Sequence, residues 1–352
     1  MKKLLNRIFV DGLSGMAYGL FATLIIGTII QQIGNLIGGS TGSMLYQFGK
    51  MAAAMTSAGI GVGVACKFRE SPLVVLSAAT AGMVGGFAGK IVAGTVFLPD
   101  GSVVLSGPGE PLGAFIAAYV AIEFSRLVAG KTRMDIILAP MLGILTGSAV
   151  GIFAGPPISS IMTQLGSLIN WGTEQQPFLM GIIVSVIMGM TLTLPISSAA
   201  LGVILNLSGL AAGAATVGCC CNMIGFAVAS FKENGVSGFL AQGLGTSMLQ
   251  VPNIVKKPVI WLPVILASAV LGPVSTLIFK MTNNATGSGM GTAGLVGQIM
   301  TWQTMVPSEG FLLVMIKIFL MHFLLPGLLS LLFCIRMRKR NWIKDGDMKL
   351  QM

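Results

Sequence analysis

The sequence predicts an all-α polytopic membrane protein with about 8–10 transmembrane helices, some of them broken or re-entrant. Of its 352 residues, 54% are hydrophobic and only 9% are charged, and the mean hydropathy is +0.88. Soluble domains contain about 25% charged residues, so this composition excludes a soluble protein. The 48 glycines suit close packing of helices within a membrane.

Apolar runs of membrane-spanning length recur along the chain, separated by polar or glycine-rich connections. The clear runs are 9–30, 51–66, 72–97, 112–127, 136–153, 178 to a break at Pro195, 259–279 and 311–335. The region 199–231 allows either a two-pass hairpin or a re-entrant pair, and 235–252 is too interrupted for a firm span. We expect the remaining cation-free stretches to be loops; these are 98–111, 155–177 and 282–298.

The Lys and Arg residues gather in every second connection, which orients the chain in the membrane. The cationic clusters are the N-terminus, 67–69, 126–133, 256–257 and the C-terminus. By the positive-inside rule both termini are cytoplasmic, with 1–8 and 336–352 as short basic tails of one membrane-embedded domain, 1–352. The net charge of +10 is explained by this pattern and by contact with membrane lipid, so nucleic acid is not an expected partner.

The run GMTLTLPISSAALG, residues 189–202, places a proline where a membrane helix should continue. Hydroxyl side chains surround Pro195; they are Thr191, Thr193, Ser197 and Ser198. A broken helix with polar side chains is typical of a transporter's midplane binding site. The alternative is a proline kink whose freed carbonyls bond to Ser and Thr.

A second polar group lies in or beside the apolar runs that follow; its members are Asn222, Gln242, Thr246, Ser247 and Gln250. Each is able to bond to a sugar hydroxyl, or to satisfy backbone groups freed at a re-entrant tip. The cysteines Cys219, Cys220 and Cys221 are consecutive and show no metal-ligand spacing, so we expect core thiols, no metal site and no cofactor.

Several segments resemble the membrane permease (IIC) subunit of bacterial phosphoenolpyruvate-dependent sugar phosphotransferase systems, nearest its fructose type. They are KFRESPLVVLSAATAGMVGG, GAFIAAYVAIEFSRLVAGKTRMDIILAPMLGIL, GPPISSIMTQLGSLIN and GTSMLQVPNIVKKP. The resemblance covers about residues 64–271. Within the family, the sequence is most similar to the standalone, perfringolysin-regulator-type branch.

The resemblance places the substrate site on two segments. In the first, Pro195, Ala199 and Ala200 keep the family's residues, while Thr191, Ser197 and Ser198 stand where the family has Asp, Asn and Lys. In the second, Gly245, Pro252 and Pro258 agree, Ser247 replaces Thr, and Met248 replaces a Glu. The resemblance therefore implies substrate-binding residues at Thr191, Pro195, Ser197, Ser198, Asn222, Thr246, Ser247 and Gln250.

Transport of a small sugar or polyol at a midplane site is the function that the resemblance implies, together with a homodimer in the cytoplasmic membrane. No polar stretch reaches the ~100 residues of a soluble domain, so we expect separate IIA and IIB proteins and no intrinsic catalytic residue. Because three charged family positions have become Thr191, Ser198 and Met248, a IIC-like sensor without phosphotransfer is the alternative. A weaker alternative is an ion-coupled secondary transporter in which Glu123 is the coupling residue.

Overall fold

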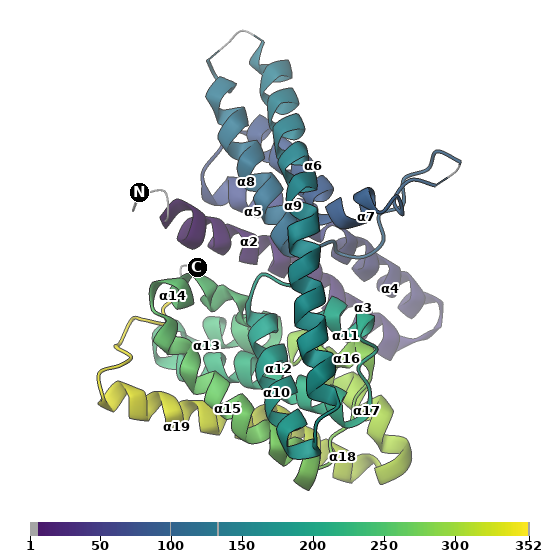
Figure 1. Cartoon of the computed structure of the whole chain (residues 1–352), viewed down its shortest axis with the longest axis vertical. Coiled ribbons are helices and arrows are strands. Elements are labelled where there is room, and N and C mark those ends of the chain that lie inside the picture. The colour runs from purple at the N-terminus through teal and green to yellow at the C-terminus, as the bar shows by residue number, and fades with distance from the viewer. Residues whose placement is uncertain (1–5, 99, 132–133, 351–352) are drawn as a thin grey trace. The chain divides into compact units, whose positions relative to one another are not determined.

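The computed structural model describes residues 6–98, 100–131 and 134–350 (Figure 1). In this part of the chain every named element is helical, and the extended pairings are two isolated bridges, Phe97 with Val103 and Gly209 with Asn283. The all-α prediction is therefore confirmed. The chain groups into two compact units, Met1–Thr163 and Gln164–Met352. That they act as one domain stays a prediction.

The first unit is a bundle of helices. Its elements are η1 Arg7–Gly12, α2 Leu13–Leu20, η2 Phe21–Ile25, α3 Ile26–Ile37, α4 Gly39–Ala54, α5 Thr56–Lys67, α6 Pro72–Gly86, α7 Ala88–Val92, α8 Pro111–Val128 and the first part of α9 Asp135–Thr173. Of these, α3, α4 and α5 are joined by very short turns, and a longer connection leads from α7 to α8. The polar stretch after the first apolar run is helical up to Gly38, whose φ of 67° turns the chain directly into α4. An L-residue rarely adopts this conformation, so glycine permits the tight turn.

Charged side chains of the first unit meet where η1, the end of α5 and the end of α8 approach one another. Arg7 contacts both Glu70 and Glu123 at 3.0 Å, and Glu123 also pairs with Arg126 at 3.2 Å. Glu123 is thus compensated by two guanidinium groups, which explains its position in an apolar helix without a coupling role.

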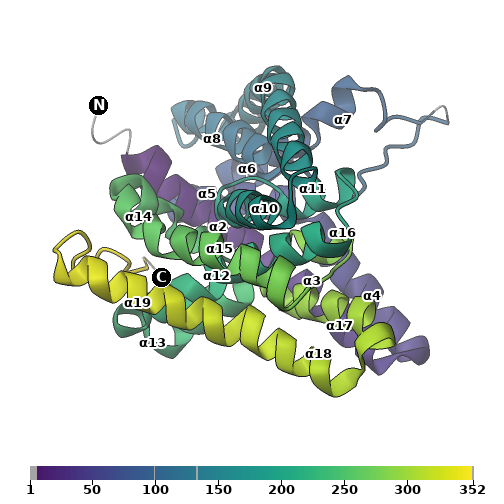
Figure 2. The same cartoon turned by 60° about the horizontal axis from the view of Figure 1, so that its bottom comes forward.

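The second unit packs its helices around α12. Its elements are α10 Pro177–Thr193, α11 Ser198–Ile204, α12 Gly209–Ala229, α13 Phe231–Leu240, η3 Ala241–Gly245, η4 Ser247–Gln250, α14 Val251–Lys256, η5 Pro258–Trp261, α15 Leu262–Pro273, η6 Val274–Ile278, α16 Ala285–Ser288, η7 Ala293–Leu295, α17 Val296–Glu309, α18 Phe311–Ile318, η8 Phe319–Leu324 and α19 Leu325–Lys339. Figure 2 shows α18 and α19 in line, flanking α12 and α15. Gly218 of α12 lies against the backbone of Ser185 in α10, so these two helices approach closely.

Six helices in the described part of the chain are long and apolar enough to cross a membrane, and two shorter apolar helices, Pro72–Gly86 and Pro177–Thr193, accompany them. The ambiguous region 199–231 resolves into the short α11 and one long helix, α12.

Two expected loops are wrong. Residues 155–173 continue α9, and 282–298 contain α16, η7 and the start of α17. A stretch without Lys or Arg indicates on which side of the membrane a connection lies. It does not indicate whether that stretch is a loop or a helix.

The final residues of the chain return to the second unit. Ile343 and Met348 are 1% and 0% exposed and join a core with Phe226, Ile260 and Val264. The segment that begins at residue 336 was expected to be a basic tail. Its first residues instead form the end of α19, which stops at Lys339, and residues that follow pack onto the second unit. Its cytoplasmic location stays a prediction.

Candidate functional site

The predicted break at Pro195 is present, between α10 and α11. α10 ends at Thr193, Leu194 is extended with ψ 160°, and the Ser197 side chain caps α11 by accepting from the N–H of Ala200 at 3.3 Å. Within α10, the Thr191 hydroxyl donates to the carbonyl of Ile187 at 2.8 Å. Thr191 and Ser197 therefore satisfy local backbone groups, as the kink alternative anticipates.

The second predicted segment is also irregular. The π-helical turn η3 ends at Gly245, and Thr246 adopts an extended conformation with φ −157°. The Thr246 hydroxyl accepts from the N–H of Met248 at 3.1 Å, which caps the 3-10 turn η4. Pro252 then stands near the start of α14, where a missing N–H costs no helical hydrogen bond.

These two irregular segments meet. The Thr193 Oγ1 and Ser247 Oγ atoms lie 2.8 Å apart, and Thr193 also lies 3.1 Å from Oδ1 of Asn222. All three side chains are 0% exposed. The sequence predicted that both segments would belong to one site, and the structure brings them into direct contact through these buried hydroxyls.

Asn222, on α12, organises this contact. Its Oδ1 accepts from the indole N–H of Trp261 at 3.0 Å, and its Nδ2 donates to the carbonyl of Gly218 at 3.2 Å and to Oγ of Ser268 at 3.4 Å. We call Thr193, Asn222, Ser247, Trp261 and Ser268 the polar layer. Its groups are all neutral, so it offers hydrogen bonds to a ligand and no charge.

Two other predicted residues lie outside this layer. Ser198 donates to the carbonyl of Gly289 at 2.7 Å, which ties α11 to the residues after α16. Gln250 donates to Oε1 of Gln242 at 2.8 Å and to the carbonyl of Met348 at 2.9 Å, which ties η4 to the C-terminal residues. The structure thus separates the predicted residues: Asn222 and Ser247 belong to the polar layer, Ser198 and Gln250 make two contacts elsewhere, and Thr191, Ser197 and Thr246 bond to nearby backbone.

Sequence reasoning left Trp261 and Ser268 out of the predicted site, and it counted Thr193 only among the hydroxyls around Pro195. From sequence, Trp261 is interpreted as an interface anchor because it lies near the end of a span, and no local pattern indicates that its N–H points at Asn222. Thr193 carried a usable signal, since it immediately precedes the break.

An open cavity of about 490 Å³ lies at the other end of α10, around Pro177 and Met180. Its polar lining is neutral: Asn170, Thr173, Gln175, Asn206 and Ser208. It includes none of the eight predicted site residues. The polar layer itself is packed, so a ligand there would have to replace existing side-chain hydrogen bonds.

Across residues 6–98, 100–131 and 134–350, no group of three or more His, Cys, Asp or Glu residues is placed to hold a metal ion. Cys219, Cys220 and Cys221 are buried free thiols of α12, as predicted. His322 is fully buried, with Nδ1 3.2 Å from Nε2 of Gln298.

A comparison with protein families agrees with this architecture. The family model described as "Phosphotransferase system, EIIC" matches residues 10–350, which include every helix of both units after the first turn of η1. The chain belongs to the phosphotransferase system EIIC family. No curated protein matches the chain.

This EIIC protein is therefore a multi-pass membrane protein and the permease component of a sugar phosphotransferase system. Members of the family work with IIA and IIB proteins on a sugar substrate. The match spans the broken helix, the polar layer and the residues up to position 350.

Proposed function

We propose that this EIIC protein binds a small sugar or polyol at the polar layer, midway through the membrane, as a fructose-type permease does. The observation that carries the proposal is the 2.8 Å contact between Thr193 and Ser247, because it joins the broken helix to the segment 245–252. Broken helices in transporters place their ends at the substrate.

The chemistry of the layer suits a neutral, polyhydroxylated ligand. The Thr193 hydroxyl already exchanges hydrogen bonds with both Asn222 and Ser247. A sugar hydroxyl both donates and accepts, so it is able to replace one partner without leaving the other unsatisfied. This matters because an unsatisfied buried polar group costs about 1–3 kcal/mol.

The remaining predicted residues have supporting roles in this proposal. Pro195 has no backbone N–H, so it cannot donate to the carbonyl of Thr191 four residues earlier, and this carbonyl is available to a ligand. The residues that fix the irregular backbone around the layer are Thr191, Ser197, Ser198, Thr246 and Gln250. Asn222 and Ser247 are then the residues of the predicted set that contact the substrate.

The wider assembly follows from the same proposal. The protein is a homodimer in the bacterial cytoplasmic membrane, with both termini cytoplasmic. Separate IIA and IIB proteins deliver the phosphoryl group from that side. The match to the EIIC family supports a permease over the sensor alternative.

Ligand-dependent thermal unfolding of the purified protein tests this function across a panel of sugars and polyols. A ligand that binds only the folded state raises its stability by about 2.7 kcal/mol at a hundredfold excess over Kd. We expect one member of the panel to raise the melting temperature, and Ser247→Ala to weaken its binding about tenfold, the equivalent of one hydrogen bond of about 1.4 kcal/mol.

Ser308→Ala is the matched control, because the Ser308 hydroxyl only donates to a carbonyl of its own helix, at Met305. It should bind like the wild type. A panel in which no compound shifts the wild-type protein would contradict the proposal, and so would an unchanged Kd in Ser247→Ala.

A further inference from the structure

A second cavity, of about 390 Å³, lies where the last residues of the chain cross α14. We call residues 341–350 the C-terminal strap. The cavity is lined by Asn253, Lys256 and Lys257 from α14 and its end, and by Gly346, Asp347, Lys349 and Leu350 from the strap. One wall therefore exists only while the strap is docked.

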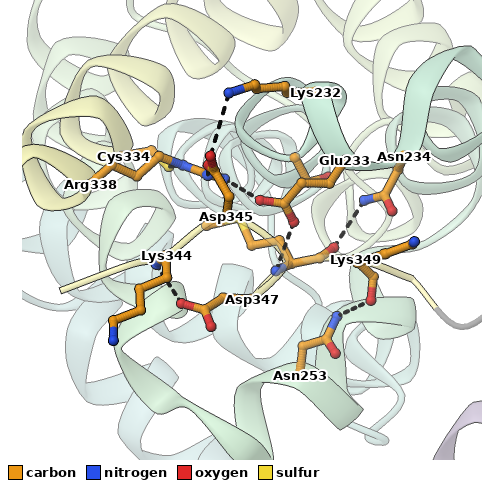
Figure 3. Close-up of polar contacts among 12 residues, drawn as sticks. Lys232, Glu233, Asn234, Asn253, Cys334, Arg338, Lys344, Asp345, Asp347 and Lys349 are labelled. Carbon is orange, nitrogen blue, oxygen red and sulfur yellow. Dashed lines mark hydrogen bonds and ion pairs between the residues drawn. The ribbon is translucent and has the colours of Figure 1, made fainter. Parts of the chain in front are cut away.

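The strap is held by specific contacts (Figure 3). Glu233 accepts from the N–H of Met348 at 2.9 Å, and Asn234 both donates to the Met348 carbonyl at 2.9 Å and accepts from the N–H of Leu350 at 2.8 Å. Asn253 donates to the Lys349 carbonyl at 3.0 Å. The side chains of Met348 and Leu350 are buried beneath these bonds.

Arg338, at the end of α19, anchors the start of the strap by pairing with both Glu233 and Asp345. Together these contacts fix the strap backbone, so the positions of Gly346, Asp347 and Lys349 around the cavity are set by the fold.

The cavity carries an excess of positive charge. Lys257 pairs with Asp347 at 2.6 Å, whereas the ammonium groups of Lys256 and Lys349 have no carboxylate partner within the described residues. Burial alone would raise the pKa of Asp347, but hydrogen bonds from Lys257 and from the N–H of Lys344 lower its pKa below the usual range. Asp347 is therefore ionised at neutral pH, so three lysines and one carboxylate line the cavity.

We propose that this cavity binds the phosphate group of a phosphomonoester. Such a group carries about −1.5 to −2 charges at neutral pH and three strong acceptor oxygens. These values match the two uncompensated ammonium groups, with Lys257 as a third donor beside them. A carboxylate carries a single charge and would leave one ammonium group without a partner.

The inference is independent of the proposed sugar site, because none of the residues of the polar layer lines this cavity. Its ligand reaches the protein from the end that carries Lys256, Lys257 and the strap. Two sources share the required chemistry, a soluble phosphate monoester and the monoester headgroup of phosphatidic acid.

The test uses the full-length protein in nanodiscs and its thermal unfolding at constant ionic strength. In phosphatidylcholine discs, glycerol 3-phosphate is titrated; in a second arm, phosphatidic acid replaces part of the phosphatidylcholine. We expect the wild-type melting temperature to rise in at least one arm. A rise with the soluble ester identifies that source, and a rise confined to the phosphatidic acid discs identifies the lipid headgroup.

The variant K256Q/K349Q removes both uncompensated charges, and we expect its half-saturating concentration to increase at least tenfold. The variant K339Q/K344Q is the control, because it removes the same charge from exposed residues outside the cavity and should respond like the wild type. The proposal is overturned if the wild-type protein responds in neither arm, or if the two double variants respond alike.

Discussion

The hydroxyl oxygens of Thr193 and Ser247 lie 2.8 Å apart although 54 residues separate them in the sequence. Each belongs to a segment in which regular helix is interrupted, one before Pro195 and one after Gly245. Their contact closes the two interruptions onto each other and, through Asn222, onto the central helix α12.

The effects of substituting Thr193 and Ser247 on the free energy of unfolding should not be additive. Thr193→Val and Ser247→Ala each remove one hydroxyl and leave its partner with one bond fewer, so each should reduce the free energy of unfolding by about 1–2 kcal/mol. The double variant should cost less than the sum of the two, because neither hydroxyl is then left without the other. Equilibrium unfolding in detergent measures the three values.

Thr304→Val provides the control for this cycle, since the exposed Thr304 hydroxyl only donates to Met300 of its own helix. We expect a change of less than about 0.5 kcal/mol there. Strictly additive losses in the double variant would show that the two hydroxyls do not interact.

The close approach of α10 and α12 depends on Gly218. A Cβ atom at this position would overlap the carbonyl of Ser185, and both groups belong to rigid helical backbone. We expect Gly218→Ala to lower the yield of folded protein severely. By contrast, a Cβ on the buried Gly243 meets Ile224 at 3.4 Å and Ala227 at 3.5 Å, ordinary contact distances.

Gly243→Ala is therefore the matched control and should fold normally. Size-exclusion chromatography of detergent-solubilised protein distinguishes the two variants. If Gly218→Ala elutes as the same folded species with unchanged stability, the helices are not held at this distance.

Membrane orientation is testable with single cysteines in a Cys66→Ser background, because Cys66 is the exposed cysteine among the described residues. Ser102→Cys and Gln176→Cys lie in cation-free connections and should react with an impermeant maleimide added to intact cells. Lys131→Cys, in a cationic connection, should react only after permeabilisation. Labelling of Lys131→Cys from outside would overturn cytoplasmic termini.

We expect phosphoryl transfer to the sugar to proceed without a phosphoryl group being attached covalently to this chain. The thiols of Cys219, Cys220 and Cys221 and the imidazole of His322 are 0% exposed, so a phosphoryl donor protein cannot reach them. With radiolabelled phosphoenolpyruvate and the complete system, we expect label on the sugar and none on the EIIC protein. Cys66→Ser should behave identically. A stable phosphoprotein band for this chain would refute the expectation.

Amino-acid composition and local sequence pattern were sufficient to predict several features of this protein. The hydrophobic content indicates a helical membrane protein because only internally hydrogen-bonded segments are stable in a bilayer. Pro195 predicts the break between α10 and α11 because proline removes a helical hydrogen bond wherever it stands in the interior of a helix. The same reasoning fails at Pro156 and Pro157, where α9 continues through both residues.

The composition of the site required the tertiary structure. The residues around Pro195 and those of 245–252 were predictable as groups, but which hydroxyl meets which depends on how α10, α12 and α15 pack. Ser198 and Gln250 were placed in the substrate group by position alone, and the structure gives them partners elsewhere, at Gly289 and at Gln242 and Met348.

The C-terminal strap shows the same division most clearly. Its sequence, NWIKDGDMKL, is polar and charged and predicts a solvated tail. Only the fold supplies Glu233, Asn234 and Asn253 as partners for its backbone and a buried site for Met348. The sequence alone determines whether a segment is able to form a membrane helix, because that depends on its own residues. The tertiary structure decides where each polar group finds its partner, because that depends on residues about one hundred positions away.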